Sequence, residues 1–222
     1  SLEKSLKQTN ARILFNQKVN SMEFDSKNKI WKIIALRGNK EFEYYSNDVI
    51  FSPPPQGLLK ILANTTNNYS QYKNRLNKLP NPSGAIVFYS ALKINKINNL
   101  FSNHYQFVNE GLGSLFLSFS EEGDGRAPRG EITLIASLFT NVKDWFDLDK
   151  DQYLHKKNEY LKKISRAIED QFKISSDSWV HRELSTPHSF ERWTNRPKGI
   201  VGGIGQSPDI FGLFGLSSRT PF

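Results

Sequence analysis

Histidines and clustered acids are the side chains in this chain of 222 residues that most often bind metals or transfer protons. The four histidines are His104, His155, His181 and His188. They do not occur at the spacing of metal ligands, and the chain has no cysteine, so a structural zinc site is not expected. Glu121, Glu122 and Asp124 miss the EF-hand spacing, and acids flanked by glycine usually form a solvated turn. We therefore expect no metal centre.

Two short sets of polar residues in the last quarter of the chain could line a site. Ser185, His188 and Glu191 have the residue types of a hydrolase triad, but the chain has no Gly-x-Ser-x-Gly turn, so nucleophilic catalysis is not predicted. His181, Glu183 and Ser185 alternate, and alternation places all three on one face of a strand. Such a face either lines a site or faces water, and the residues alone favour water.

Glycines cluster over residues 199–205 in the order Gly-x-x-Gly-Gly-x-Gly. A dinucleotide-binding turn needs Gly-x-Gly-x-x-Gly between a strand and a helix, whereas Ser207 and Pro208 follow here. The cluster is therefore not a Rossmann turn. Glycines also allow the backbone to approach a flat ligand or another backbone closely, and both interpretations stay open.

The elements that would position these residues begin with three apolar runs rich in β-branched and aromatic residues. The runs cover 11–24, 30–36 and 42–51. Turn-forming residues at 25–28 and 37–40 separate them, which predicts a three-stranded antiparallel meander. Prolines from Pro53 onward end the third run, because proline cannot donate to a sheet. Short helices are expected over 1–10, 57–63 and 69–79.

Four further strands and one long helix are predicted beyond Pro80. The strands cover 85–94, 114–120, 132–139 and 179–185. The first is apolar on both faces, as expected of a strand covered on both sides. The helix covers 151–173 and begins with a variant capping box, Asp149 and Gln152. From His188 onward there is little periodicity. The pattern predicts an α+β fold, with helices on one side of a mixed or antiparallel sheet and a small β-meander beside it.

Composition restricts the expected cellular compartment and the expected classes of binding partner. Hydrophobic residues make up 37% of the chain, enough for a core, and the net charge of +8 is spread along the sequence rather than gathered in a stripe. Nucleic acid is therefore a disfavoured partner. The lack of cysteine and of long apolar runs favours a cytoplasmic protein that does not span a membrane, and peripheral membrane contact stays open.

Residues 183–208 resemble a late segment of FAD-dependent phytoene desaturases and carotenoid isomerases, a family of the flavin amine-oxidase-like superfamily. In that family a Thr-Pro-x-(Thr/Ser)-(Phe/Tyr)-x-Arg stretch leads into Gly-x-x-Gly-Gly, and Thr186 to Gly203 is similar to it. Residues 118–130 look like the family's Ser…Asp…Ala-Pro-x-Gly signature, with Asp124 at the acidic position. Residues 11–19 and 48–54 look like its flavin-domain strands. The likeness covers nearly the whole chain and is strongest at 183–208.

The resemblance implies a domain division and a missing part. Residues 1–56 would belong to a flavin-binding domain, 57–187 to a substrate domain, and 188–222 would return toward the flavin domain. The family's N-terminal Gly-x-Gly-x-x-Gly and C-terminal Gly-Asp motifs are absent. We therefore expect a fragment, whose partner is the dinucleotide-binding portion of the same protein. FAD is the expected cofactor of the full-length protein, and this fragment is not expected to bind it tightly.

The resemblance also implies roles for individual residues. Those nearest the cofactor would be Val19, Ser52, Pro53, Pro54, Gly202 and Gly203. Those nearest the isoalloxazine ring or the substrate would be Arg192, Trp193 and Gln206. The implied activity is desaturation or cis–trans isomerisation of a carotenoid-type polyene, with no catalytic residue assigned. The alternative is a non-enzymatic module that binds an apolar ligand or a partner through the same aromatic residues.

Overall fold

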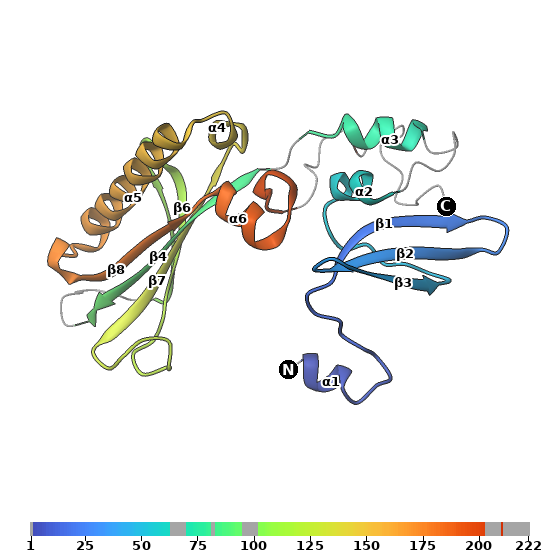
Figure 1. The fold of residues 1–222 in the computed structure, drawn as a ribbon. Helices are drawn as coiled ribbons and strands as arrows, with labels where there is room; N and C mark the ends of the chain where they lie inside the picture. The colour runs from blue at the N-terminus through green and yellow to red at the C-terminus, as the bar shows by residue number, and fades with distance from the viewer. Residues whose placement is uncertain (1, 63–69, 81–82, 95–101, 203–209, 211–222) are drawn as a thin grey trace. The chain divides into compact units, whose positions relative to one another are not determined.

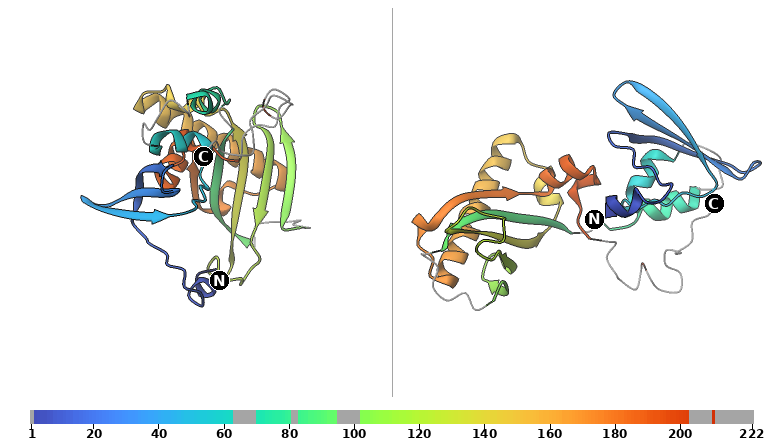
Figure 2. Two further views of the ribbon diagram at one scale, coloured as in Figure 1. Left: turned by 90° about the vertical axis from the view of Figure 1, so that its right-hand side faces the viewer. Right: turned by 90° about the horizontal axis from the view of Figure 1, so that it is seen from below.

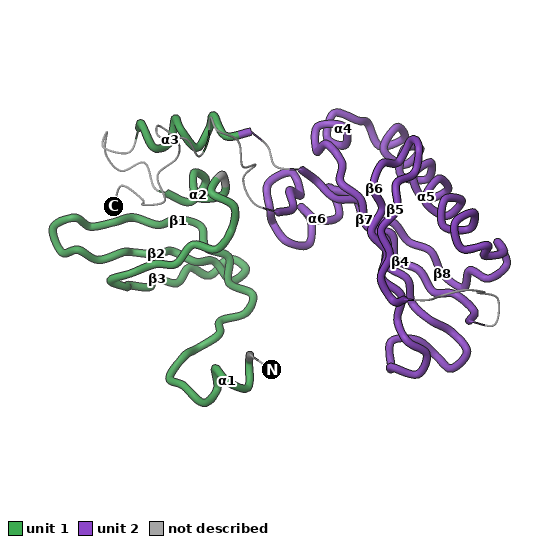
Figure 3. Tube along the Cα trace, turned by 180° about the vertical axis from the view of Figure 1, so that it is seen from behind, with its two compact units in different colours: residues 1–79, 207–222 green, residues 80–206 purple. Residues whose placement is uncertain are grey.

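The computed structural model describes residues 2–62, 70–80, 83–94, 102–202 and 210. The chain forms two compact units, residues 1–79 with 207–222 and residues 80–206, which we call unit 1 and unit 2 (Figure 3). The sequence-based division placed its first boundary at residue 56, whereas unit 1 also holds residues 57–79. The functional roles given to those segments stay predictions.

Unit 1 contains the predicted β-meander. Its strands are β1 (Lys18–Asp25), β2 (Ile30–Arg37) and β3 (Lys40–Ser46), paired antiparallel in the order β1-β2-β3 (Figure 1). The Asp25 carboxylate accepts hydrogen bonds from the backbone N–H groups of Lys27 and Asn28, which builds the first turn. The third strand is shorter than the predicted 42–51, because Ser46 already pairs with Trp31, at the start of β2. Strand pairing therefore stops where the partner strand ends.

Short helices complete unit 1. They are α1 (Leu2–Leu6), α2 (Pro55–Ile61) and α3 (Ser70–Asn77), close to the predicted ranges. Pro55 occupies the first turn of α2, where its missing N–H costs nothing. The buried cluster between meander and helix is small, with Met22, Trp31, Leu58 and Leu62 as its members.

Unit 2 is built on a five-stranded antiparallel sheet in the order β5-β6-β7-β4-β8. Its strands are β4 (Gly84–Lys93), β5 (His104–Asn109), β6 (Gly113–Phe119), β7 (Glu131–Thr140) and β8 (Trp179–Ser185). Four of them match predicted strands. The edge strand β5 was not predicted, although polar His104 and Gln106 alternate with Tyr105 and Phe107.

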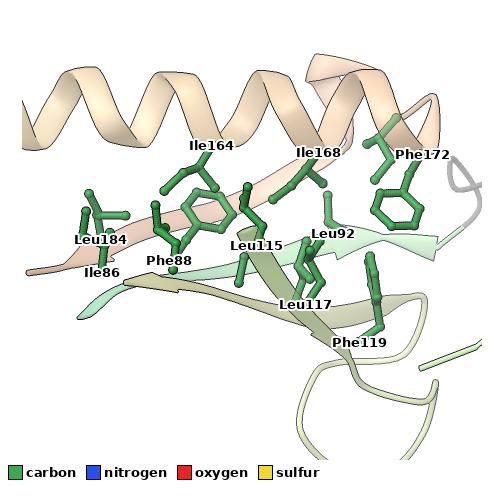
Figure 4. Packing of buried hydrophobic residues seen from close by; sticks show 14 of the residues in the cluster. Ile86, Phe88, Leu92, Leu115, Leu117, Phe119, Ile164, Ile168, Phe172 and Leu184 are labelled. Carbon is green, nitrogen blue, oxygen red and sulfur yellow. The ribbon is translucent and has the colours of Figure 1, made fainter. Parts of the chain in front are cut away.

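One long helix, α5 (Lys150–Phe172), lies along one face of this sheet (Figures 1 and 2). Its predicted capping box is present: the Asp149 carboxylate accepts from the N–H groups of Asp151 and Gln152, and the Gln152 side chain accepts from the Asp149 N–H. Ile164, Ile168 and Phe172 of this helix pack onto side chains of the sheet (Figure 4). The helix ends at Lys173, whose φ is +54°.

Shorter helices connect these elements. They are α4 (Lys143–Phe146), α6 (Pro187–Thr194) and the 3₁₀ turns Ser176–Ser178 and Pro197–Gly199. The predicted α+β class is confirmed, with an antiparallel sheet, a helix on one side and a separate meander. The expectation that β4 is covered on both sides is wrong. Its even-numbered residues are buried against α5, but Tyr89 on the other face is 37% exposed. Among the described residues, no helix is long and apolar enough to cross a membrane.

Candidate functional site

The face of the five-stranded sheet opposite α5 exposes several large apolar side chains. Side chains alternate between the two faces along a strand. Phe88, Leu117 and Leu134 are buried on the face that α5 covers, so the residues next to them in sequence lie on the opposite face. We call the large apolar side chains that the three inner strands, β4, β6 and β7, place on that face the apolar strip. Its members are Val87, Tyr89, Phe116, Ile135 and Phe139.

Strand pairing brings the members of the apolar strip together. Tyr89 lies opposite Ile135, and Ser137 separates Val87 from Phe116 in the adjoining row. Exposed fractions are 77% for Phe139, 49% for Phe116 and 41% for Ile135. Neighbouring large apolar side chains exposed on one face are typical of a surface that binds an apolar ligand or a partner.

Polar residues border the apolar strip on both edge strands. On β8, His181 and Glu183 lie opposite Ala91 and Tyr89, on the open face, as the alternation predicted. The His181 Nε2 and Glu183 Oε2 atoms are 3.8 Å apart, and both side chains are more than 60% exposed. On β5, the His104 ring stacks on Phe116 with 6.0 Å between ring centroids.

A β-bulge at Val180 sends Trp179 to the opposite, helix-covered face. Residues Ala91 and Leu92 of β4 pair with His181 and Trp179, so Val180 is the extra residue. Trp179 then donates a hydrogen bond from Nε1 to the Glu169 side chain of α5, at 2.6 Å. The bulge therefore separates the packing residue Trp179 from the exposed pair His181 and Glu183.

Helix α6 begins directly after β8 and is held firmly at its start. The Tyr153 hydroxyl on α5 hydrogen-bonds the buried Thr186 hydroxyl at 2.9 Å. The His188 ring lies 4.2 Å from the Phe146 ring, centroid to centroid, and its Nε2 is 2.9 Å from the Trp145 carbonyl oxygen. His188 therefore has a structural role.

The turn after α6 folds back onto the start of the helix. The Glu191 carboxylate accepts a hydrogen bond from the Lys198 N–H at 2.9 Å. Gly199 has a φ of +57°, and a Cβ there would lie 1.8 Å from the Pro187 carbonyl oxygen. At Gly199, therefore, glycine allows the close approach of two backbones, which is one of the two interpretations that the sequence left open.

The predicted substrate residues divide between described and undescribed parts of the chain. Arg192 and Trp193 lie on α6, with the guanidinium carbon of Arg192 5.5 Å from the Trp193 ring centroid. Trp193 is 78% exposed, which is unusual for so large an apolar side chain. Gly202 has a φ of +77° and open space around the position of a Cβ. Gly203 and Gln206 lie outside the described residues.

The predicted cofactor residues near the N-terminus all lie in unit 1. Val19 is on β1, opposite Ala35, and is 38% exposed. Ser52 and Pro53 are exposed, and Pro54 is half-buried just before α2. A cavity of about 470 Å³ lies within the unit. It is lined by Met22, Trp31, Asp48, Val49, Ile50, Phe51, Pro53, Pro55, Leu58 and Tyr72. Of the predicted cofactor residues, only Pro53 is among this described lining.

The acidic glycine loop is an internally bonded turn. The Asp124 carboxylate accepts from the backbone N–H groups of Glu121 and Arg126 and forms an ion pair with the Arg126 guanidinium at 2.6 Å. The Arg126 side chain lowers the pKa of Asp124. Among the described residues, no group of three or more acidic or histidine side chains lies close enough together to bind a metal ion.

The sequence reasoning missed the apolar strip, although its signal was present. Phe116 interrupts a serine-rich strand face, and Ile135 and Phe139 alternate with buried residues of β7. Helix α6 was also missed. Thr186, Pro187 and Ser189 form a recognisable helix start, with proline in the first turn and the Ser189 hydroxyl accepting from the Thr186 N–H.

Comparison with known proteins finds a similarity that covers part of the chain. No family model matches the chain. A stretch of 115 residues, 51% of this chain, is 30% identical to "Prolycopene isomerase, chloroplastic" of Arabidopsis thaliana. The matched part is 19% of that protein, so the chain spans about a fifth of the curated relative. This weak similarity supports, at most, a relation to carotenoid isomerase-like or desaturase-like proteins.

Proposed function

We propose that this chain is part of an FAD-dependent oxidoreductase that desaturates or isomerises a carotenoid-type polyene. In this proposal, the open face of the unit 2 sheet forms the apolar wall against which the polyene lies. The observation that carries it is the apolar strip, in which Phe116, Ile135 and Phe139 stay exposed on a well-packed sheet. The similarity to a prolycopene isomerase favours a polyene over other apolar ligands.

The dimensions of the apolar strip suit a long, thin, apolar molecule. Ile135 and Phe139 are four residues apart on β7, or about 13 Å at the usual rise of a strand. Neighbouring strands add roughly 5 Å each in the other direction. A polyene has no hydrogen-bonding groups along its chain, so removal of apolar surface from water drives its binding. A flat sheet face exposing aromatic and aliphatic side chains provides that surface.

FAD would supply the redox chemistry, and this chain would bind and orient the reactants. Gly202 fits such a role, because its positive φ and the open space around it let a flat ring approach the backbone. In the proposal, Arg192 and Trp193 contact the ring or the polyene. Gly203 and Gln206 would do the same. Val19, Ser52, Pro53 and Pro54 would contact the dinucleotide. A dinucleotide-binding portion outside these 222 residues would hold the pyrophosphate.

Titration of the chain with a polyene tests the ligand part of this proposal. Binding would be followed by quenching of tryptophan fluorescence, with the polyene delivered from cyclodextrin. Replacing Phe116 and Phe139 by serine should weaken binding by tenfold or more, because a buried phenylalanine contributes on the order of 2 kcal/mol. The matched control is Phe15→Ser, an exposed phenylalanine of unit 1 whose loss should change nothing. Equal binding by the double variant and the wild type would contradict the proposal.

The flavin part needs the longer protein. A complete reading frame containing this chain should yield a yellow protein with flavin absorbance. A colourless product that ignores added FAD but still binds the polyene would favour the non-enzymatic apolar-ligand module instead.

A further inference from the structure

We propose that Tyr89, Glu183 and His181 form a polar subsite beside the apolar strip, and that it binds a hydroxyl group carried by an otherwise apolar polyene. This inference rests on the proposed function, because it assumes that the apolar strip binds the polyene chain. It adds a chemical class of ligand, a polyene alcohol rather than a pure hydrocarbon.

Strand register brings the three side chains together. Tyr89 of β4 lies directly opposite Glu183 of β8, and Ala91 lies opposite His181 in the next row. Directly opposite residues of an antiparallel pair share a face, with Cβ atoms about 5 Å apart. Tyr89 also lies opposite Ile135 on its other side. The Tyr89 ring is therefore part of the apolar strip, while its hydroxyl belongs to the polar border.

The three side chains have unused hydrogen-bonding capacity. In the described part of the chain, the Tyr89 hydroxyl has no hydrogen-bond partner, and the side chain is 37% exposed. The His181 Nε2 and Glu183 Oε2 atoms are 3.8 Å apart, which exceeds a hydrogen-bond distance. A ligand hydroxyl needs one acceptor and one donor. The Glu183 carboxylate provides the acceptor, and the Tyr89 hydroxyl or the His181 ring provides the donor.

On the opposite border of the apolar strip, two polar side chains already hydrogen-bond each other. There the Gln106 side chain donates to the Ser114 hydroxyl at 2.9 Å, and the His104 ring stacks on Phe116. The Gln106 and Ser114 side chains on the β5 side are therefore already hydrogen-bonded to each other, whereas the Tyr89 hydroxyl is not. A polar group on the ligand finds free partners on the β8 side.

The charges around the subsite disfavour an anionic ligand group. Glu183 repels a carboxylate. Lys93 lies two residues beyond Ala91 on the same face of β4. Glu131 lies opposite Lys93, so Glu183, Lys93 and Glu131 together carry one net negative charge. A neutral hydroxyl, with one donor and one acceptor, matches the acceptor of Glu183 and the donors of Tyr89 and His181.

A matched pair of probes tests the subsite on the 222-residue chain. All-trans-retinol has a polyene chain with a terminal hydroxyl, and retinyl methyl ether lacks the O–H donor. We expect the wild type to bind retinol about three- to tenfold more tightly than the ether, as measured by tryptophan quenching. Glu183→Gln and Tyr89→Phe should each reduce that preference to about twofold or less. Glu110→Gln, the same change of charge in the turn after β5, should leave the preference intact.

The outcomes distinguish failure of the subsite from failure of the proposed function. Equal affinities of the wild type for alcohol and ether, or a preference that Glu183→Gln and Tyr89→Phe leave unchanged, would overturn the subsite while the polyene surface stands. Failure of both probes to bind would overturn the proposed function and the subsite together. Circular dichroism of the variants verifies that the sheet is intact.

Discussion

The two compact units differ in how completely they bury their apolar side chains. In unit 2, α5 and the five-stranded sheet enclose one continuous cluster, in which Phe88, Leu117, Trp145 and Ile168 have no exposed surface. In unit 1, the meander and α2 enclose a cluster of four buried residues beside a cavity. Ile50 of unit 1 is 96% exposed. The stability of the described chain is therefore concentrated in unit 2.

The difference follows from the size of the sheet and of the helix that packs on it in each unit. A sheet is stable when another element covers its apolar face, and a 23-residue amphipathic helix does so in unit 2. A three-stranded meander has little area to bury, and α2 is seven residues long. Unit 1 therefore leaves apolar side chains exposed. In unit 2, the open face of the sheet also exposes apolar side chains.

The largest expected effect comes from removing a core ring of unit 2. Phe88 is fully buried and packs edge to face on Trp179, with 5.6 Å between centroids. Phe88→Ala should lower the free energy of unfolding by about 3–5 kcal/mol, because it leaves a cavity that the sheet cannot close. Guanidinium unfolding followed by circular dichroism measures the loss.

The matched variant in unit 1 is Phe24→Ala, at a half-buried phenylalanine beside Trp31. Its cost should be less than half as large. Hydrogen exchange with mass spectrometry assigns each loss to its unit. If Phe24→Ala costs as much as Phe88→Ala, the contrast between the units is wrong.

A second prediction asks whether the backbone of unit 2 is as tightly packed as its core. Gly199→Ala places a Cβ 1.8 Å from the Pro187 carbonyl oxygen, so the turn must move away from α6. We expect a loss of about 2 kcal/mol or more in thermal or denaturant unfolding. Gly202→Ala is the control, since it also has a positive φ but meets no atom within 4 Å. Equal costs at both positions would argue that only the dihedral angle matters.

A third prediction compares the two faces of the unit 2 sheet. Phe139 is 77% exposed on the open face, so Phe139→Ser should change stability by no more than about 0.5 kcal/mol. Phe119→Ser, on the covered face, should be severely destabilising, because Phe119 is 2% exposed and packs against Phe172. Thermal unfolding of both variants checks the prediction. A large loss for Phe139→Ser would mean that the open face is part of a core.

The smallest expected effect concerns an exposed ion pair of unit 1. Lys32 Nζ lies 2.6 Å from Glu43 Oε1, and this hydrogen bond is the main reason that the pKa of Glu43 is lowered. A lowered carboxyl pKa stabilises the fold above the usual Glu pKa of about 4.3, and that stability is lost as the pH falls through the lowered value. The melting temperature of Glu43→Gln should therefore be slightly lower than that of the wild type near neutral pH, and the two should be equal in acid. Because the pair is exposed, added salt should remove the difference, and a salt-independent difference would contradict this explanation.

Local sequence signals predicted most of the elements. The capping box at Asp149, the apolar spacing of α5 and the turn residues after Asp25 all act within a few positions of the chain, so they can be read without a fold. The edge strand β5 was missed because only one of its faces packs on the core. Helix α6 was missed because its short length gives little periodicity, although Thr186 and Pro187 signalled its start.

The candidate site depended on contacts that sequence alone does not contain. Alternation put His181 and Glu183 on one face of β8, but only strand order and register placed Tyr89 opposite Glu183 and Ile135 opposite Tyr89. The sequence also favoured a β4 covered on both sides. It shows which residues of the strand are apolar, but it does not show which face packs against a helix. The sequence therefore determined the elements, through interactions between near neighbours. Tertiary structure decided which apolar face stayed open, because burial depends on what packs against a strand from distant parts of the chain.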